Sequence, residues 1–307
     1  MSSRSEPLRL IILANKLKES VNQALEEIRP WLRQKARIVA EPDIVSLTPD
    51  VVGELPQADL ALVLGGDGTI LSQARLILDL DVPLVGVNCG KVGFLAEFTV
   101  DDLVKYWDKI VGGQYRTSLR LMIEVLVFDS EAADCRADRL DMEHLKAQSL
   151  AMNDAVITAG PPYRMIELDL AIEPPHASSR RRRATRFGGD GVIISTPSGS
   201  TAYNLAAGGP IVAPGIDAFC ITPNCPQSLA FRPIVVSAEC GVAVRIAWAN
   251  PGTTLVIDGQ VSVNLERDDQ LYIRRYTKRL RLLENPSVNF WKTLARKMHW
   301  AAQPQRG

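Results

Sequence analysis

The chain has 307 residues, of which 46% are hydrophobic and 23% charged, and its formal net charge is zero. This length and composition are typical of a soluble protein with one large or two ordinary domains. A balanced charge gives no reason to expect nucleic acid or an anionic membrane as a partner, and no apolar run approaches the roughly 20 residues that span a bilayer. The polar N-terminus carries no signal-peptide pattern, so we predict a cytoplasmic protein.

The cysteines and histidines predict neither disulfides nor a metal site. The five cysteines are an odd number without framework spacing, which favours free thiols in a reducing compartment. Cys220 and Cys225 have no second pair or nearby histidine to complete a zinc site. The three histidines are scattered, so a histidine-based catalytic triad finds no support.

The first 113 residues alternate between strand and helix patterns. Such alternation is typical of a parallel α/β sheet, in which ligands gather at the carboxyl ends of the strands. Pro30 should weaken or kink the first helix near its end. The predicted strands are 8–14, 36–40, 61–64 and 82–87, the predicted helices are 17–35, 69–80 and 101–110, and 42–56 is predicted as a loop or small helix.

The third predicted strand ends in a glycine-rich turn, Gly65-Gly66-Asp67-Gly68, and a helix follows from Thr69. Glycine has no Cβ, so main-chain N–H groups can approach a phosphate closely, and the start of a helix adds partial positive charge. A carboxylate that only lined such a site would repel phosphate, so Asp67 is better explained as a general base or a ligand of Mg²⁺. The alternative is an ordinary glycine turn with a solvated Asp67, and the strand and helix around the turn weigh against it.

After Gly113 the pattern changes to short strands separated by turn residues, and helical patterns become scarce. This pattern predicts a mostly β domain. The predicted strands are 119–128, 149–158, 165–172, 191–195, 234–237, 242–247, 253–257 and 270–274.

The predicted domain boundaries follow from this change of pattern. An α/β domain should cover residues 1–113, and a β-rich domain should cover 114–284. Residues 288–300 are helical again, and a lone terminal helix needs a surface to cover. We therefore expect 285–307 to pack back on the first domain.

Two polar segments lie outside this pattern. Residues 129–147 are acidic and weakly patterned, so we expect a surface excursion. The basic run Arg180–Arg183, with Arg186, lies between predicted strands. A solvated hairpin is one interpretation, and a lip that attracts phosphate is the other. No aromatic residues interleave with these arginines, so stacking on nucleic acid is not supported.

A second candidate site lies in the β-rich half, where Gly188-Gly189-Asp190-Gly191 precedes a predicted strand and then the run Thr196-Pro197-Ser198-Gly199-Ser200-Thr201-Ala202-Tyr203. Its hydroxyl groups predict a helix N-cap at Ser200 or Thr201 and exposed N–H donors. Tyr203 can stack on a base or a ribose. A capped helix that packs on small residues is the alternative, and it accounts for Ser200 but not for the whole block.

These motifs together resemble those of NAD kinases. GGDGT alone is shared with diacylglycerol and sphingosine kinases and, as GGDGS, with phosphofructokinases, whereas the block that begins at Thr196 is highly specific. The resemblance covers nearly the whole chain, with the motifs in the order of that family. It rests on GGDGT at 65–69, the loop at 88–95, Asn153-Asp154, TPSGSTAY at 196–203 and AAGGPI at 206–211.

The resemblance implies phosphoryl transfer from ATP or polyphosphate to the 2′-hydroxyl of the adenosine ribose of NAD⁺. In-line attack with Mg²⁺ neutralising the phosphates would let positioning and electrostatics carry most of the rate. The phosphates are expected to hold Mg²⁺, so no metal ligand is assigned. Asp67 is expected to be the general base, accepting the proton late, as charge develops on the ribose oxygen.

Further roles are implied residue by residue. An amide can read the adenine edge, and a carboxylate can accept hydrogen bonds from ribose hydroxyls. Asp190 would bind the nicotinamide carboxamide, and Asp258 would join the site from a later β loop. The expected phosphate loop is Gly65, Gly66, Thr69 and Lys91, and the expected NAD-binding residues are Gly68, Asn153, Asp154, Asp190, Ser195, Thr201, Ala202, Tyr203 and Asp258.

Two positions depart from relatives of this kind. Ser198 stands where many relatives carry threonine, and the hydroxyl is retained. Gly188 stands where some NAD-restricted relatives place arginine. Because nothing bulky or cationic at Gly188 would favour the oxidised ring, we predict that NADH is accepted as well as NAD⁺.

Two other functions compete with this hypothesis. A lipid or sphingoid kinase would act at a membrane, and the chain has no basic amphipathic helix for that purpose. A non-catalytic NAD(P) sensor would have no use for Asp67 beside phosphate. The resemblance also implies a homodimer or homotetramer assembled through the β domain.

Overall fold

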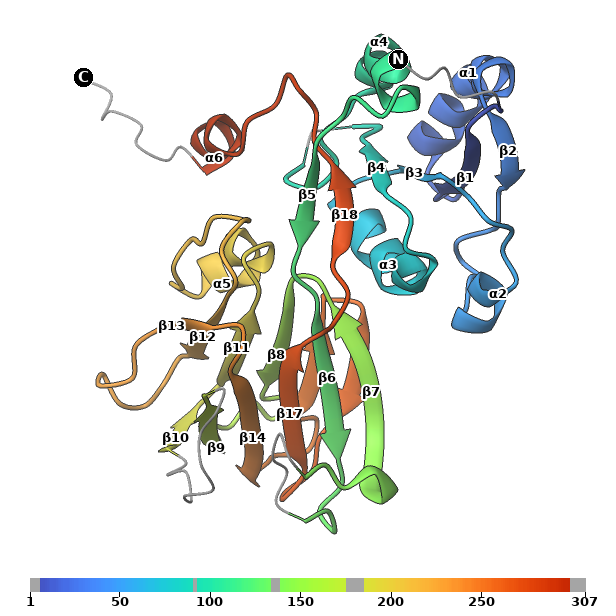
Figure 1. Ribbon diagram of the computed structural model, residues 1–307. Helices are drawn as coiled ribbons and strands as arrows, with labels where there is room; N and C mark the ends of the chain where they lie inside the picture. The colour runs from blue at the N-terminus through green and yellow to red at the C-terminus, as the bar shows by residue number, and fades with distance from the viewer. Residues whose placement is uncertain (1–5, 91–92, 134–138, 175–184, 299–307) are drawn as a thin grey trace, which may run out of the picture. The chain divides into compact units, whose positions relative to one another are not determined.

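The computed structural model describes residues 6–90, 93–133, 139–174 and 185–298. The chain forms two compact units (Figure 1), of which unit 1 is residues 1–119 with 280–307 and unit 2 is residues 120–279. The sequence analysis placed the boundaries at 113 and 285. The difference arises because strands β5 and β18, at the two junctions, both belong to the sheet of unit 1.

Unit 1 is an α/β domain built on one six-stranded sheet with the order β2-β1-β3-β4-β18-β5. Strands β2, β1, β3, β4 and β18 pair in parallel. The strands of unit 1 are β1 (Arg9–Ala14), β2 (Arg37–Ala40), β3 (Leu60–Leu64), β4 (Leu84–Val87), β5 (Thr117–Arg120) and β18 (Leu280–Leu283). Its helices are α1 (Glu19–Lys35), α2 (Pro49–Gly53), α3 (Asp67–Ile77), the 3₁₀ turn η1 (Leu78–Leu80), α4 (Val100–Val111) and α6 (Phe290–Met298).

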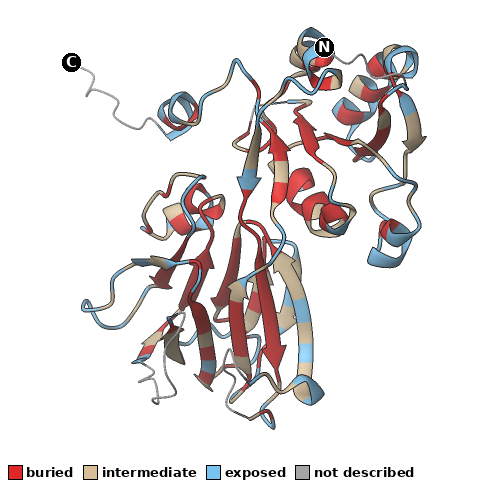
Figure 2. Ribbon diagram, viewed as in Figure 1, coloured by how far each residue is buried: buried red, intermediate tan, exposed pale blue. Residues whose placement is uncertain are grey.

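Helical spacing of apolar residues explains how the helices of unit 1 pack. Helix α1 buries Val21, Leu25, Ile28 and Leu32, so one face meets the sheet, and Pro30 lies within the helix without ending it. Helix α4 begins with a capping box in which Thr99 and Asp102 bond each other's main-chain N–H groups. In Figure 2 strands β1, β3, β4 and β18 of this sheet are buried along most of their length, whereas the edge strands β2 and β5 are mostly intermediate or exposed.

Unit 2 is made of two six-stranded sheets, and the described strands of each sheet pair antiparallel. The sheet orders are β10-β9-β14-β17-β6-β7 and β13-β12-β11-β8-β15-β16. Their apolar side chains form one core, to which both sheets contribute, as Val125 and Ile157 show. The strands are β6 (Ile123–Phe128), β7 (Leu145–Ala151), β8 (Asp154–Thr158), β9 (Ile166–Glu173), β10 (Thr185–Gly189), β11 (Gly191–Ser195), β12 (Ala218–Asn224), β13 (Ile234–Ser237), β14 (Gly241–Trp248), β15 (Thr254–Ile257), β16 (Val261–Asn264) and β17 (Gln270–Arg275). The helical turns are η2 (Met142–His144), η3 (Gly199–Thr201) and α5 (Tyr203–Ala206).

The predicted fold class is confirmed: an α/β unit and a β unit, with the last helix in the first of them. Four strands of this fold were not predicted, namely β10, β12, β16 and β18. In the part of the chain that the structure describes, no helix combines the length and the apolar character needed to cross a membrane.

Candidate functional site

The glycine-rich turn of unit 1 has the geometry that the sequence predicts for it. Strand β3 is buried throughout and ends at Leu64. Gly65 follows with φ +155°, and a Cβ there would lie 2.5 Å from Oγ1 of Thr69, so the position requires glycine. Added Cβ atoms at Gly66 and Gly68 would meet nothing within 4 Å. The turn therefore leaves open space directly at the start of helix α3, where an anion is favoured.

Asp67 is the first residue of helix α3, and a loop 27 to 29 residues further along the chain surrounds its carboxylate. Its Oδ2 accepts from the N–H of Phe94 at 2.8 Å. Its Oδ1 accepts from the N–H groups of Leu95 at 3.1 Å and Ala96 at 3.0 Å. A carboxylate offers about four acceptor positions, so one remains on Oδ2 after these three bonds.

Gly93 shows how tightly this loop fits around Asp67. A Cβ on Gly93 would lie 1.7 Å from Oδ1 of Asp67, far inside contact distance. Upstream in the same loop, the side-chain oxygen of Asn88 accepts from the N–H of Gly90 at 2.6 Å. Lys91, which the sequence analysis assigned to the phosphate loop, lies outside the described residues.

Unit 2 contains a pocket of about 310 Å³. It unites five of the residues predicted to bind NAD⁺, and Tyr203 among them is 46% exposed. The other lining residues were not predicted. Val156 and Thr158 could have been, because side chains two residues apart share one face of a strand and both follow Asp154 at this spacing on β8. The pocket is lined by Asn153, Asp154, Val156, Thr158, Ala202, Tyr203, Val256, Asp258 and Gly259.

Asp258 holds the entry to strand β8 in the same way that Asp67 holds its loop. Its Oδ2 accepts from the N–H of Met152 at 3.0 Å. Its Oδ1 accepts from the N–H groups of Asn153 at 2.7 Å and Asp154 at 3.1 Å. Asp258 is 7% exposed and has φ +50°, a left-handed conformation that aspartate tolerates better than most residues. The carboxylate thereby fixes the main chain that presents two pocket residues.

Asn153 and Asp154 are the two polar groups of the pocket with unusual surroundings. Burial, together with the nearby charge of Asp258, raises the pKa of Asp154 to about 7. The side-chain oxygen of Asn153 is buried and has no hydrogen-bond partner among the described residues. A buried acceptor without a partner is costly, so this oxygen is suited to accept from a ligand's N–H group.

The hydroxyl groups of Thr196, Ser200 and Thr201 in the 196–203 block, and that of Ser195 before it, bond to main-chain oxygens within unit 2. Ser195 and Thr201 are buried and do not line the pocket. The Oγ of Ser195 donates to the main-chain oxygens of Asn153 and Thr196, at 3.3 Å and 3.0 Å. The Oγ of Ser200 donates to Pro197 O at 2.7 Å and accepts from the N–H of Val212 at 3.0 Å.

The N-cap prediction for this block is wrong. Neither the 3₁₀ turn η3 nor the short helix α5 has a side-chain cap. The Oγ of Ser200 instead accepts a hydrogen bond from the N–H of Val212, a residue that follows both turns in the sequence. The hydroxyls therefore stabilise the fold of the block, and Ala202 and Tyr203 are its members that reach the pocket.

Asp190 lies in the turn between β10 and β11, away from the lining of the pocket. Its main-chain oxygen accepts from the N–H of Ala159 at 2.8 Å, and its N–H donates to Asn224 O at 3.0 Å. Its carboxylate accepts from the thiol of Cys225 and thereby raises the pKa of Cys225. The structure thus places Asp190 beside an exposed thiol.

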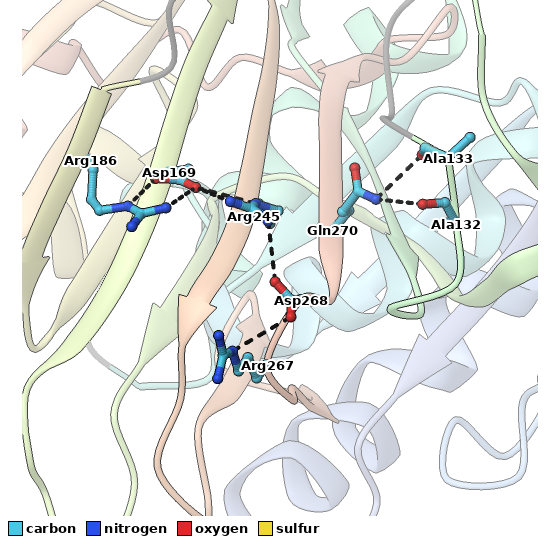
Figure 3. Close-up of polar contacts among 8 residues, drawn as sticks. All are labelled: Ala132, Ala133, Asp169, Arg186, Arg245, Arg267, Asp268 and Gln270. Atoms are coloured by element: carbon cyan, nitrogen blue, oxygen red, sulfur yellow. Dashed lines mark hydrogen bonds and ion pairs between the residues drawn. The ribbon is translucent and has the colours of Figure 1, made fainter.

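Arg186, at the described end of the basic segment, belongs to a network of surface ion pairs (Figure 3). It binds both carboxylate oxygens of Asp169, at 2.7 Å and 2.9 Å, and Arg245 binds the same carboxylate at 2.7 Å. These two cations lower the pKa of Asp169. The run Arg180–Arg183 lies outside the described residues.

The described residues contain no group of three or more His, Cys, Asp or Glu side chains that could hold a metal ion. Asp67 in unit 1 and Asp258 in unit 2 are each bound to three main-chain N–H groups. In proteins Mg²⁺ is usually bound by one or two carboxylates together with substrate phosphates, so a single carboxylate of either unit fits an ion that the phosphates of a nucleotide carry.

Comparison with known families gives matches to both units of the chain. The family described as ATP-NAD kinase N-terminal domain matches residues 11–115, and the family described as ATP-NAD kinase C-terminal domain matches residues 152–284. The NAD kinase of Rhodopirellula baltica is 33% identical over 298 residues, which cover 97% of this chain and 88% of the relative. The NAD kinase of Geobacter metallireducens is 38% identical over 248 residues, covering 80% of this chain and 81% of the relative.

Two solved structures share the fold. Yeast NADH kinase in complex with NADH has a TM-score of 0.78 and 22% sequence identity, over 99% of this chain and 91% of the yeast chain. An NAD kinase from Archaeoglobus fulgidus in complex with ATP has a TM-score of 0.67 and 23% identity, over 95% of this chain and 99% of that chain. At these identities the likeness establishes the fold.

Proposed function

The chain belongs to the ATP-NAD kinase family and is an enzyme of this kind, and we propose that it transfers the terminal phosphoryl group of ATP to the 2′-hydroxyl of the adenosine ribose of NAD⁺. The bond between the γ-phosphorus and the bridging oxygen of ATP breaks as the bond to the ribose oxygen forms, so the products are NADP⁺ and ADP. The observation that carries the proposal is Asp67, a carboxylate held in place at a helix start where two glycines leave open space.

In this mechanism Asp67 removes the proton from the 2′-hydroxyl as the ribose oxygen attacks the phosphorus atom. The carboxylate needs no reorganisation, because three main-chain N–H groups already fix its position. The remaining acceptor position on Oδ2 is the one available to the hydroxyl. A free carboxylate is a weak base, so the proton transfers late, when negative charge has developed on the oxygen.

The nucleotide phosphates are proposed to bind at the turn formed by Gly65, Gly66, Gly68 and Thr69. Gly66 and Gly68 have no neighbour where a Cβ would stand, so main-chain N–H groups there can approach an anion. Lys91 is proposed to add a positive charge to this phosphate loop. Mg²⁺, or another divalent cation, bound mainly through the phosphates would neutralise their charge when present.

The pocket of unit 2 is proposed to bind the NAD⁺ nucleoside. The unpartnered oxygen of Asn153 accepts from the exocyclic amino group of adenine, and ionised Asp154 accepts from ribose hydroxyls. Tyr203, which is half-exposed at the pocket, stacks on the base or ribose. Ser195 and Thr201 support this site from within the fold, and Asp190 is proposed to bind the nicotinamide carboxamide.

An assay with three acceptors tests the proposed function. Purified protein is mixed with radiolabelled ATP, Mg²⁺ and either NAD⁺, NADH or diacylglycerol vesicles, and the labelled product is separated and identified for each acceptor. We expect turnover with NAD⁺. Phosphate transfer to the lipid without any to NAD⁺ would identify a lipid kinase, and binding of NAD⁺ without turnover would identify a sensor. Replacing ATP with polyphosphate in the same assay decides the donor.

Further expectations stay predictions at this point. We propose a homodimer or homotetramer in the cytoplasm, with no nucleic acid or membrane partner. Size-exclusion chromatography with light scattering measures the molar mass of the protein in solution, and the mass of a monomer would contradict this expectation.

A further inference from the structure

The C-terminal part of unit 1 contacts the loop that surrounds Asp67. We name residues 93–97 the Asp67 loop and residues 285–298 the C-terminal strap. The strap consists of a turn, in which the N–H of Val288 donates to the main-chain oxygen of Asn285, followed by helix α6 (Phe290–Met298). Both the loop and the strap are described residues of unit 1.

The first contact is made by Asn285 at the beginning of the strap. Its side-chain amide donates to the main-chain oxygen of Glu97 at 2.9 Å and to Oδ2 of Asp102 at 3.0 Å. Its main-chain N–H donates to the carboxylate of Glu97 at 3.1 Å. Asn285 is 1% exposed, so these bonds are shielded from water and anchor the strap to the end of the Asp67 loop.

The second contact is made by helix α6 on the ring of Phe94. The rings of Phe290 and Phe94 have centroids 6.2 Å apart. The ammonium group of Lys297 lies 5.2 Å from the centroid of the Phe94 ring, within the range of a cation–π interaction. Thr293 and Leu294, between these two residues, are buried, so helix α6 is packed along this part of its surface.

Phe94 therefore belongs to two sets of contacts at once. Its main-chain N–H donates to Oδ2 of Asp67 at 2.8 Å, and its ring contacts Phe290 and Lys297. Any movement of helix α6 that carried the ring of Phe94 with it would shift the N–H group that orients the carboxylate. The strap and Asp67 thus contact the same loop through different atoms of its residues.

We propose that the C-terminal strap is a positioning element for Asp67: through Phe94 and Glu97 it fixes the loop whose N–H groups orient the carboxylate. This inference rests on the proposed role of Asp67 in phosphoryl transfer. Phe290 and Lys297 are positioning residues in this scheme, since they act through Phe94. A displacement of reacting groups by about 1 Å can cost 10²-fold in rate, so the contact can matter without touching substrate.

The test compares variants of the full chain that differ by one contact. Phe290→Ala removes the ring, and Phe290→Tyr retains it. Lys297→Ala removes the cation over Phe94, and Arg296→Ala is its matched control, because Arg296 is an exposed cation of the same helix. For each variant we measure amide hydrogen exchange at residues 94–96, together with kcat and the KM for NAD⁺.

We expect Phe290→Ala and Lys297→Ala to speed exchange at residues 94–96 and to lower kcat by between about 5-fold and 10²-fold, with the KM for NAD⁺ unchanged. Phe290→Tyr and Arg296→Ala should retain wild-type exchange and kcat. Unchanged exchange in both Phe290→Ala and Lys297→Ala would overturn the proposal, and so would faster exchange with wild-type kcat. If Phe290→Ala fails to fold, Lys297→Ala carries the test.

The outcome is separable from that of the proposed function. If wild-type protein makes no NADP⁺, the proposed function fails, while the exchange rates still report whether the strap holds the Asp67 loop. If wild-type protein is active and the strap variants match it in exchange and kcat, the strap proposal alone fails.

Discussion

Each of the two units contains an aspartate whose carboxylate binds three successive main-chain N–H groups, and the surroundings of the two aspartates differ. In unit 1, Asp67 binds the N–H groups of three successive residues, 94 to 96, and in unit 2, Asp258 binds those of residues 152 to 154. In both cases one carboxylate oxygen accepts two bonds and the other accepts one. The sequence separations differ, at 27 to 29 residues for Asp67 and 104 to 106 for Asp258.

The surroundings of the two carboxylates differ, and their proposed roles rest on this difference. Asp258 is buried beside a second carboxylate, Asp154, whose pKa rises to about 7. Asp67 is only half-buried and stands at the start of a helix next to exposed Gly68. A buried carboxylate that organises main chain stabilises a binding pocket, whereas a half-buried one keeps an oxygen accessible to a reacting hydroxyl.

The largest expected effect is a loss of kcat when Asp67, and not Asp258, is replaced by asparagine. Asp67→Asn should lower kcat by about 10²–10⁴-fold, because the amide cannot take up the proton and its NH₂ group would face one of the N–H groups of residues 94–96, while NAD⁺ binding survives. Steady-state kinetics and calorimetric titration with NAD⁺ measure the two quantities. Asp101→Asn is the control, since Asp101 is an exposed aspartate in the first turn of helix α4. Near-wild-type turnover in Asp67→Asn would remove the base assignment.

Asp258→Asn should instead act on stability and on binding. The new NH₂ group would face a main-chain donor and leave a buried N–H unsatisfied, which costs about 1–3 kcal/mol in the free energy of unfolding. The KM for NAD⁺ should rise more than kcat falls, since Asp258 fixes two pocket residues. Denaturant unfolding and kinetics test this. Asp268→Asn is the control, because Asp268 also has a positive φ but lies on the surface. A drop in kcat as large as that of Asp67→Asn would erase the contrast.

The pKa of Asp154 gives a pH dependence that only unit 2 should show. The folded-state pKa of about 7 is raised from 3.8, so folding favours the protonated form. The resulting stabilisation is fully present below about pH 4 and is lost as the pH rises to about 7, at about 1.4 kcal/mol per pH unit in between. Urea unfolding at several pH values should show this slope in the wild type, and Asp154→Asn should lack it. If the wild type and Asp154→Asn showed the same dependence of the free energy of unfolding on pH, titratable groups other than Asp154 would be its cause.

The smallest expected effect concerns the choice between NAD⁺ and NADH. With glycine at 188 we expect comparable kcat/KM for both nucleotides. Gly188→Arg should lower kcat/KM for NADH relative to that for NAD⁺, since the introduced cation would not favour binding of the reduced nicotinamide ring. The atoms nearest to a Cβ at 188 are Cε, Sδ and Cγ of Met165, so this flexible side chain must move, and Gly188→Ala controls for that movement. No turnover of NADH by the wild type would refute this prediction.

The sequence predicts the strands and helices well where one pattern dominates. Buried apolar runs identified β3 and β4, and the period of α1 identified its buried face. The missed strands lack such signals. Strand β10 ends in two glycines, β12 contains Pro223, β16 has four residues, and β18 is mostly leucine, which equally suits a helix.

The site was predictable in its residue types but not in its contacts. The glycine turn and Asn153-Asp154 stand out in the sequence because polar or glycine residues border apolar strands. No sequence pattern predicts the hydrogen bond between Asp258 and the N–H of Asp154 in strand β8. The two residues are 104 positions apart, and only the folded chain brings them together. The hydroxyls of the 196–203 block misled the N-cap prediction because their partners, such as Val212, lie outside the local segment.

The most direct test of the central claim supplies the missing carboxylate from solution. Asp67→Ala removes the carboxylate at a position bordered by open space at Gly66 and Gly68, so formate can enter. We expect almost no NADP⁺ formation by this variant until formate is added, and a saturable gain in kcat that sodium chloride at equal ionic strength does not produce. Asp67→Ala that turns over NAD⁺ at near the wild-type rate without any added carboxylate would contradict the claim.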